Sequence, residues 1–514
     1  MANIRLSRIE VIGGGPGGAF AARLLKLARP SAEVTLYDRL PPEDTFGFGV
    51  GLSVSTQRSL SRSDPETFAL IADASHSGHG FELHSAGGYE RIAGNGQVAV
   101  ARAKLLQILY RQAEQAGVKI VVGSPVDAFG RDADLVVAAD GVNSATRASG
   151  ADVFGARESV GRQKYIWCGA DTALPNALFG PAESDFGVLT THAYPYAFDR
   201  STFLVETDEH TWRAAGFDRD ISHLQRGESD EAAREFLEEV FKEHLDGAKL
   251  LGNNSRWTQF RTVRCDRWHH GNVVLLGDAA HTAHYSVGSG TKLAMEDAIA
   301  LTASLDGDPA NLDDAFTAYR AAREPGVAQL QYLAHRSELW WESYVDRMRG
   351  LSPAQMVVSF FSRAGNVSLQ TLREREPEVV NRALIDYGCE VPSDDPVSWT
   401  ISQPLDHGTT TLPSRRTDDA HVSLVSLHCD LDDPRSPEAL DFVDSATAAA
   451  QTTRADGIEL LGPSDAHAVR RRLDIAEQIK FRSSILTAVR APEALRADLA
   501  AALIAGRTDL ISLD

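Results

Sequence analysis

The segment from Leu275 to Ala298 combines residues that can hold a flat or anionic ligand with residues that can exchange protons. An apolar stretch ends at Asp278, and small residues then lead through Gly288–Gly290 into a helix-forming run. Glycines in such a turn let backbone amides approach a ligand closely. His284 and Tyr285 lie in the same turn, where an imidazole can serve as a base near neutral pH. The segment therefore predicts a ligand-binding turn flanked by two polar rings.

The N-terminal elements predict where a ligand's phosphates would bind. The pattern favours a strand at Ile9–Ile12, a helix at Ala19–Ala28 and a second strand at Glu33–Tyr37. The turn between the first two has the form G-x-G-x-x-G, which places backbone amides and a helix N-terminus against a pyrophosphate. Asp38 stands where an acid binds the ribose of an adenosine. Arg39 suggests a 2′-phosphate on that ribose, but FAD and NAD both remain allowed. The candidates here are Gly13, Gly15, Pro16, Gly17, Gly18, Asp38 and Arg39.

Two further segments carry polar residues at the ends of predicted elements. The apolar strand that begins at Asp134 ends in Asp140-Gly141, and Arg102 begins an amphipathic helix. Asp140 could instead be only a turn-forming residue, and Arg102 only a solvated helix charge.

These motifs occur in the order and spacing of the FAD-dependent aromatic hydroxylases, the single-component flavoprotein monooxygenases related to p-hydroxybenzoate hydroxylase. The chain resembles this family over residues 5–345. The resemblance implies that the glycine turn binds the FAD pyrophosphate, Asp38 the ribose and Arg102 the diphosphate side. Asp278 would contact the ribityl or pyrophosphate region, and Gly288–Thr291 would lie along the isoalloxazine. The further cofactor-binding candidates are Gly49, Val50, Arg102, Asp140, Gly141, Asp278, Gly288, Ser289, Gly290, Thr291 and Lys292.

The turn also narrows the resemblance to one branch of the family. Most members have a proline and an asparagine where this chain has Tyr285 and Lys292. The pattern A-H-[aromatic]-S-x-G-S-G-T-K-L-A-M-E-D is similar to the salicylyl-CoA hydroxylases and the two-domain 2-aminobenzoyl-CoA monooxygenase/reductases. The resemblance implies catalytic roles for His281, His284 and Tyr285 where the flavin meets the substrate. In the simpler alternative, His281 caps the turn and His284 packs in the core.

The densest cationic cluster of the chain lies between Ser255 and His270. Its arginines could bind the phosphates of coenzyme A, or they could form the solvated basic face of a strand. The substrate-binding candidates are Arg261, Arg264 and Arg267, together with Tyr165 and Trp167.

Composition excludes several other classes of function. The chain of 514 residues carries a net charge of −20, which opposes binding to nucleic acid or to an anionic membrane. Its 4 cysteines lack metal-ligand spacing and are expected to be free thiols, so no metal site is predicted. The N-terminus has no secretion signal and no apolar run is long enough to span a membrane, which predicts a cytoplasmic protein.

The expected fold is α/β, with a Rossmann-like FAD-binding domain interleaved with a β-sheet substrate domain. The FAD-binding domain would comprise residues 1–155 and 256–345, and the substrate domain residues 156–255. A helical connection over 346–393 would lead to a small α/β domain at 394–514, which begins with a linker-like composition. Three short apolar runs separated by helices predict parallel strands there. This part resembles a truncated (β/α) barrel.

The resemblance implies hydroxylation of an aromatic acyl-CoA thioester, foremost salicylyl-CoA to gentisyl-CoA, through a C4a-hydroperoxyflavin with NADH or NADPH and O2. The alternatives are 2-aminobenzoyl-CoA, or a free aromatic or indolic metabolite. A reductase or FAD-binding scaffold without oxygen insertion is the alternative from another class. The sequence allows a homodimer but determines neither the oligomeric state nor the substituents of the ring.

Overall fold

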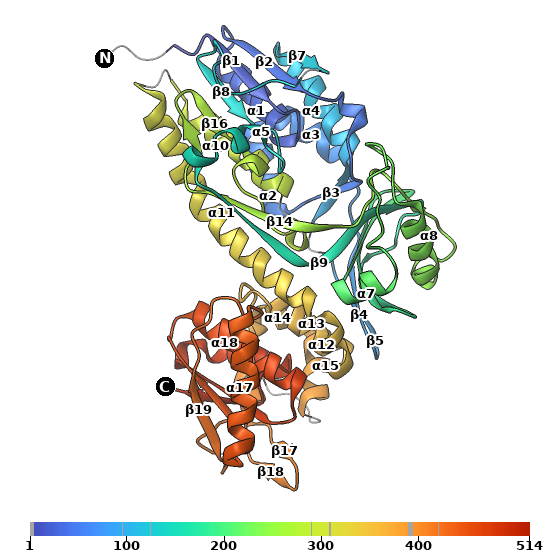
Figure 1. Cartoon of the computed structure of the whole chain (residues 1–514), viewed down its shortest axis with the longest axis vertical. Helices are drawn as coiled ribbons and strands as arrows, with labels where there is room; N and C mark the ends of the chain where they lie inside the picture. The colour runs from blue at the N-terminus through green and yellow to red at the C-terminus, as the bar shows by residue number, and fades with distance from the viewer. Residues whose placement is uncertain are drawn as a thin grey trace. The chain divides into compact units, whose positions relative to one another are not determined.

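The computed structural model describes residues 5–94, 96–123, 125–288, 290–307, 310–388, 394–419 and 421–514. The chain forms two compact units, Met1–Phe81 with Ala93–Glu342, and Glu82–Ile92 with Ser343–Asp514. Both units contain helices together with strands (Figure 1), so the expected α/β class is confirmed.

A six-stranded sheet forms the base of the first unit. Its order is β15-β16-β8-β1-β2-β7, and all pairs are parallel except β15 with β16. The central strands β1, β8 and β16 are short and almost wholly buried, as is typical of a sheet covered by helices on its faces. Their bounds are β1 Arg8–Ile12, β2 Glu33–Asp38, β7 Lys119–Val122, β8 Leu135–Ala138, β15 His269–His270 and β16 Val273–Leu275.

The helices of this unit pack closely at the glycine turn. The first helix, α1 (Pro16–Ala28), has Gly15 as its N-cap and a proline at its first position, whose fixed φ favours helix initiation. A Cβ on Gly17 would lie 2.8 Å from Ala294 Cβ in α10, so this contact requires a glycine. The other helices include α2 Val54–Ser63, α3 Pro65–Asp73, α4 Arg102–Ala116, α10 Gly290–Ser304 and α11 Leu312–Glu342.

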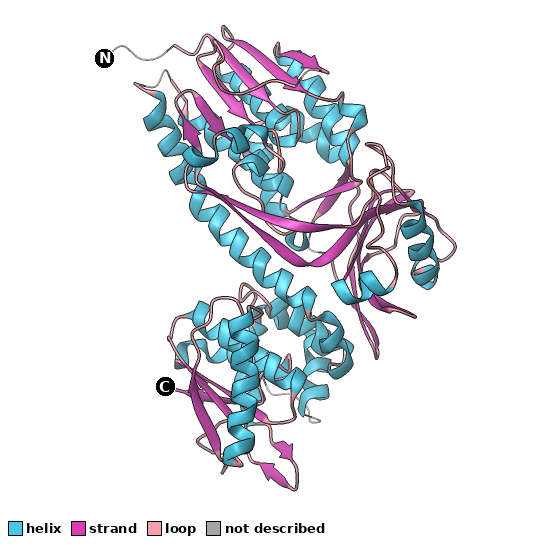
Figure 2. Cartoon of the chain, in the orientation of Figure 1, coloured by secondary structure: helices cyan, strands magenta, loops and turns pink. Residues whose placement is uncertain are grey.

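A second, antiparallel sheet has two chemically different faces. Its strands are ordered β13-β9-β12-β11-β10, and β14 pairs along β9 to form the long ribbon seen in Figure 2. Side chains alternate between the faces of a strand, so Phe203 and Val205 pack against α8 while Leu204 and Glu206 face the other way. The elements are β9 Ala156–Ala170, β10 Ala177–Ser184, β11 Gly187–Ala197, β12 Arg200–Thr207, α7 Glu209–Ala214, α8 Glu231–Val240, α9 Lys242–Leu245, β13 Leu250–Leu251 and β14 Thr258–Cys265. A separate two-stranded pair joins β3 Gly49–Leu52 to β6 Val98–Ala101.

The second unit contains a four-stranded parallel sheet in the order β19-β20-β21-β22. The three parallel strands expected from the sequence are confirmed as β20, β21 and β22, and the structure adds β19 and α17 before them. The stretch expected as a linker contains α16 and the β17–β18 hairpin instead, so that expectation was wrong there. The elements are α12 Tyr344–Gly350, α13 Pro353–Ser362, α14 Leu369–Arg375, α15 Pro377–Gly388, α16 Pro396–Ser402, β17 Leu405–His407, β18 Thr410–Leu412, β19 Leu424–His428, α17 Pro437–Thr453, β20 Gly457–Leu461, α18 Ala466–Arg482, β21 Leu486–Ala491, α19 Arg496–Ile504 and β22 Leu510–Leu513.

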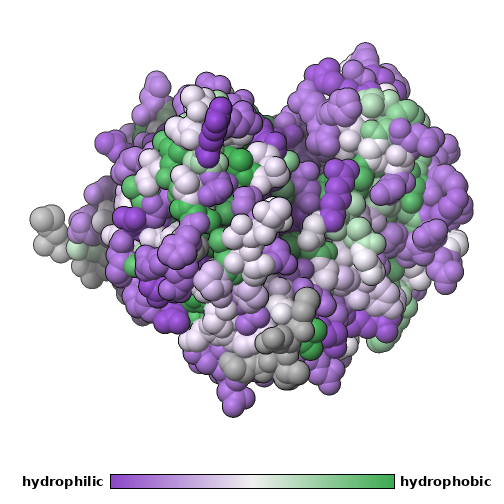
Figure 3. Space-filling view, turned by 90° about the horizontal axis from the view of Figure 1, so that it is seen from below, coloured by the Kyte–Doolittle hydropathy of each residue, from purple (hydrophilic) through white to green (hydrophobic). Residues whose placement is uncertain are grey.

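The polarity of the surface and the burial of the cysteines are those of an ordinary globular protein. The face shown in Figure 3 is largely hydrophilic, with hydrophobic residues in scattered patches. Among the described residues, no helix has the length and apolar character needed to cross a membrane. Cys168, Cys265 and Cys429 are buried free thiols, as expected, and Cys389 lies outside the described residues.

Candidate functional site

The glycine turn after β1 is shaped by close backbone contacts on one side and open space on the other. Gly13 has a φ of +102°, and a Cβ there would lie 2.2 Å from the carbonyl oxygen of Ala139. Its N–H donates to Tyr37 O at 2.8 Å, which fixes the turn to β2. A Cβ on Gly15 would meet nothing within 4 Å. The turn therefore presents the N-terminus of α1 to open space, where a phosphate can approach.

Asp38 lies at the end of β2 and bonds back to the same turn. Its Oδ2 accepts hydrogen bonds from Gly14 N–H at 2.6 Å and from the Tyr110 hydroxyl at 3.2 Å. Burial, with Asp38 nearby, raises the pKa of Tyr110 well above its usual range, so this phenol stays a donor. Reasoning from the sequence did not single out Tyr110, because its spacing is that of the apolar residues of α4. Arg39 is exposed.

Polar groups from three further elements lie at this end of the sheet. Asp140 Oδ2 accepts from the backbone N–H and the hydroxyl of Thr146, both at 3.0 Å. The other oxygen, Oδ1, is buried with no hydrogen-bond partner in the described part of the chain. Burial lowers the pKa of Arg102 and raises that of Asp278, and the attraction between the two groups opposes both shifts. Arg102 Nε also donates to the Thr45 hydroxyl at 3.3 Å.

These groups fit a dinucleotide cofactor. A Cβ on Gly141 or Gly290 would meet nothing within 4 Å, as at Gly15. Open glycine backbone, a helix N-terminus and an unpaired carboxylate oxygen at Asp140 are the groups that phosphates and ribose hydroxyls need. The described residues therefore offer a site of the kind that the sequence predicts.

His281 contributes to a buried network beneath the turn. Its Nε2 lies 2.8 Å from Asp297 Oδ2, and its ring packs 4.8 Å from that of Trp268. Asp297 also accepts from Gly277 N–H at 3.0 Å and from Arg323 Nε at 2.7 Å. Burial raises the pKa of Asp297, but His281 and Arg323 outweigh it and hold that pKa below its usual range. This geometry suits an anchor for the turn, the simpler of the two roles considered for His281.

Tyr285 meets a buried carboxylate that the sequence did not single out. Its hydroxyl donates to Glu206 Oε2 at 2.5 Å, and His192 Nε2 lies 3.0 Å from Glu206 Oε1. Glu206 is 1% exposed. Burial opposes its ionisation, but the contact with His192 and the hydrogen bond from Tyr285 outweigh burial and lower the pKa of Glu206, so it is charged at neutral pH. The pKa of Tyr285 is raised by burial and by Glu206, so the phenol keeps its proton.

Aromatic rings surround Tyr285 on several sides. Tyr165 and Trp167, predicted to bind substrate, have ring centroids 4.8 and 5.9 Å from that of Tyr285. Their register on β9 places Tyr165 beside Glu206 of β12. Trp341 of α11 packs 3.7 Å from His192. The sheet face and the turn thus meet in a cluster of flat rings around one anionic group.

His284 is buried next to Tyr285. Its Nδ1 lies 2.9 Å from Ser286 Oγ, which donates to Ser337 Oγ at 2.9 Å. Its ring lies 5.0 Å from that of Phe260. Burial lowers the pKa of His284, which favours the neutral imidazole at neutral pH.

The predicted cationic cluster consists of separated and mostly partnered arginines. Arg261 bonds to Asn143 and lies 3.7 Å from Glu158, and Arg264 Nε donates to Gln331 at 3.1 Å. Arg267 is exposed after the end of β14.

The remaining cofactor candidates have separate surroundings. Gly49 O accepts from the Tyr194 hydroxyl at 2.8 Å, Val50 follows in β3, and Lys292 lies 3.4 Å from Glu296. Ser289 lies outside the described residues.

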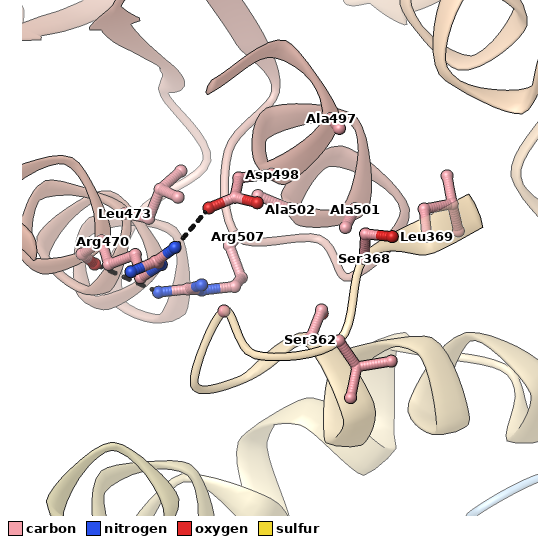
Figure 4. Close-up of a pocket in the computed structure, with 12 residues that line it drawn as sticks. Ser362, Ser368, Leu369, Arg470, Leu473, Ala497, Asp498, Ala501, Ala502 and Arg507 are labelled. Atoms are coloured by element: carbon pink, nitrogen blue, oxygen red, sulfur yellow. Dashed lines mark hydrogen bonds and ion pairs between the residues drawn. The ribbon is translucent and has the colours of Figure 1, made fainter. Parts of the chain in front are cut away.

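The second unit has a small pocket of its own (Figure 4). Arg470 and Arg507 point into this region, but each is ion-paired, with Asp498 and Asp474 at 2.7 and 2.6 Å. Paired charges of this kind do not make an anion site. This pocket therefore supplies no candidate anion site in the part of the chain that the structure describes.

Comparisons with known proteins agree with this geometry. Residues 110–329 match the model of a family described as FAD binding domain. The chain is 35% identical over 527 residues to salicyloyl-CoA 5-hydroxylase of a Streptomyces species, covering 98% of this chain and 99% of that protein. The chain belongs to the FAD-dependent aromatic hydroxylases. FAD is thus its cofactor, and an aromatic small molecule is its substrate.

Other relatives act on different substrates. The 3-hydroxy-4-methyl-anthranilyl-[aryl-carrier protein] 5-monooxygenase of Streptosporangium sibiricum is 37% identical over 365 residues, with 71% of this chain and 96% of that protein covered. Among solved structures, 2-methyl-3-hydroxypyridine-5-carboxylic acid oxygenase superposes with a TM-score of 0.53 at 22% identity, over 70% of this chain and 96% of that one. Pseudomonas aeruginosa PqsL gives 0.51 at 21% identity, over 66% and 97%. These structures support the fold.

Proposed function

We propose that this hydroxylase acts on an aromatic acyl-CoA thioester, with salicylyl-CoA as the preferred substrate and gentisyl-CoA as the product. The observation that carries the proposal is the similarity to salicyloyl-CoA 5-hydroxylase, which extends over 98% of this chain and so includes most of its second unit. NADH or NADPH would be the transient reductant. Because these metabolites are cytoplasmic, we place the reaction in the cytoplasm.

The ring would bind between the sheet face and the turn. Tyr165, Trp167 and Tyr285 offer flat apolar surfaces that can hold a benzene ring. The hydroxyl of Tyr285 uses its one hydrogen to donate a hydrogen bond to Glu206. Its oxygen can therefore only accept a hydrogen bond from the substrate. An ortho hydroxyl on the substrate is a donor and matches this acceptor.

The protein and the cofactor would divide the work of hydroxylation. When bound, FAD would supply the oxygen chemistry of the reaction. Arg102, Asp278 and the glycine turn would hold the cofactor, and His284 would orient the ring or its leaving proton as a neutral imidazole. Burial of the Tyr285 cluster keeps water away, which protects a reactive oxygen donor from side reactions.

We assign the parts of the chain as the sequence suggests. Residues 1–155 and 256–345 would bind FAD, 156–255 would cover the substrate, 346–393 would connect, and 394–514 would form the small α/β domain. Arg261, Arg264 and Arg267 are the candidates for contacts with the coenzyme A phosphates, because β14 and the residues just after it carry them to or near the protein surface.

A substrate panel tests this proposal. Purified protein with FAD is given salicylyl-CoA, 2-aminobenzoyl-CoA or free salicylate while NADH oxidation and product mass are followed. We expect salicylyl-CoA to stimulate NADH oxidation most and to gain one oxygen atom. Oxidation of NADH that yields only peroxide with every compound would contradict the proposal and favour a reductase.

A thioester of 2-aminobenzoate is the second candidate. The carrier-protein enzyme of Streptosporangium sibiricum acts on an anthranilyl group, and an aromatic amine can donate to Tyr285 as a phenol does. Faster turnover of 2-aminobenzoyl-CoA than of salicylyl-CoA in the same panel would select this alternative.

A further inference from the structure

The Tyr285 cluster has an electrostatic property that bears on substrate choice. Glu206 is enclosed at the junction of β12 and the turn, and both of its oxygens are bonded, to Tyr285 and to His192. Glu338 of α11 is a second carboxylate, close enough to affect Tyr285 and His284. Glu206 belongs to the sheet face that would hold the ring, and Glu338 belongs to α11.

Positive charge near these acids is limited. His284 favours its neutral form, since burial lowers its pKa. Arg261 acts on Tyr165, but Glu158 lies 3.7 Å from it and Asn143 also bonds to it. His335 lies 3.6 Å from Glu338. His192 lies against Oε1 of Glu206, whereas the other oxygen, Oε2, accepts from the uncharged Tyr285 hydroxyl that would face the ring.

We infer that Glu206, acting through Tyr285, makes the ring site select an uncharged acyl substituent and reject the free aromatic carboxylate. The inference deepens the proposed function and rests on it. A thioester or an amide carries no charge at the carbonyl, whereas a free acid brings a second anion beside Glu206. At about 7 to 12 Å and an effective dielectric constant of about 20, this repulsion weakens binding by about 50-fold to about tenfold.

Glu206 is therefore a specificity-determining residue, and Tyr285 connects it to the substrate. Because the phenol donates inward, a carboxylate oxygen of the substrate would find an acceptor facing it and no donor. A phenol or amine next to an uncharged carbonyl meets no such conflict. Charge and hydrogen-bond direction thus favour the same class of substrate.

The test compares two small ligands that differ mainly in charge, salicylamide and salicylate. Each is titrated into the FAD-bound protein at about pH 7, where the amide is largely neutral and the acid is an anion, and binding is followed by the change in flavin absorbance, without turnover. Wild type should bind salicylamide at least about tenfold more tightly than salicylate. Glu206→Gln keeps the size of the side chain and an acceptor for Tyr285, so it should reduce that ratio about tenfold or more with FAD content unchanged.

Two further variants make the result specific. Glu183→Gln makes the same change of net charge at an exposed position of β10 and should leave the ratio as in wild type. Glu338→Gln should lower the ratio in the same direction but less, because this side chain is less buried. If Glu206→Gln fails to fold, the affinity ratio measured in Glu338→Gln still tests the inference.

The outcomes separate this inference from the proposed function. If wild type hydroxylates salicylyl-CoA but binds both small ligands equally, or if the ratio stays constant in Glu206→Gln and Glu338→Gln, Glu206 does not set specificity. An equal response in Glu183→Gln would assign the effect to net charge and overturn the role of Glu206. If salicylyl-CoA neither binds nor reacts, the proposed function fails and this inference fails with it.

Discussion

Gly15→Val should abolish FAD binding without unfolding the protein. A Cβ at position 15 would meet no atom within 4 Å, and its φ of −61° suits any residue, so the cofactor-free protein has room for the side chain. The loss of a glycine N-cap costs about 1 kcal/mol or less. The same side chain would occupy the space that a pyrophosphate needs at the N-terminus of α1. Folding and binding are thus expected to separate at this residue.

The magnitude follows from linkage between binding and unfolding. FAD at about 100 times its Kd stabilises a protein by about 2.7 kcal/mol. For the first unit this corresponds to a rise in Tm of about 4 °C, which Gly15→Val should lose.

Gly17→Val is the matched control, because a Cβ there lies 2.8 Å from both Ala294 and Leu276. It should destabilise the cofactor-free protein by about 1 to 3 kcal/mol. Thermal unfolding of the cofactor-free proteins, with and without FAD, measures both effects. A full FAD-dependent rise in Gly15→Val would show that the turn does not hold phosphate.

The remaining predictions concern the buried ion network and the basic strand. Asp297→Asn removes the carboxylate that accepts from Arg323 Nε, while Glu296 stays 3.2 Å from Arg323, so the free energy of unfolding should fall by about 1.5 to 3 kcal/mol; a loss below about 0.5 kcal/mol would refute the anchoring role. Burial opposes ionisation of Asp297, but His281 and Arg323 still depress its folded pKa, so its contribution is present above the unfolded pKa of about 4 and is lost as pH falls through the folded value. Denaturant unfolding between about pH 3 and 6 should therefore show a shallower pH dependence in Asp297→Asn than in wild type. Arg264→Glu should raise the KM for salicylyl-CoA several-fold and added salt should do the same, whereas unchanged kinetics would make this strand a solvated face.

The cofactor half of the fold could be predicted because its signals are local. The strand, glycine turn, helix and second strand follow one another within residues 8–38, and the structure forms them as β1, α1 and β2. Gly13 and Gly17 allow close contacts with Ala139 and Ala294, whereas Gly15 leaves open space at the start of α1. A motif of this kind can be recognised in a single sequence because its residues lie close together along the chain.

The substrate half could be predicted only in part, because its contacts join distant strands. Glu206 and His192 are paired across β11 and β12, and Tyr285 reaches them from a turn far along the chain. One signal was available: in Ser201–Thr207 an acid alternates with apolar residues and takes the face opposite Val205. Which partner that acid would meet depends on the packing of sheet against turn, which sequence spacing does not encode.

The most direct test of the central claim is the yield of hydroxylated thioester per NADH oxidised in wild type and in Tyr285→Phe. The claim is that the aromatic ring is held at the Tyr285–Glu206 cluster beside the FAD site. The variant should keep FAD, because Tyr285 is not among the groups proposed to hold it, yet misplacing the ring by about 1 Å can cost on the order of a hundredfold in rate. NADH oxidation should therefore continue while product per NADH falls and peroxide rises. The same yield in Tyr285→Phe as in wild type would contradict the claim and place the substrate elsewhere.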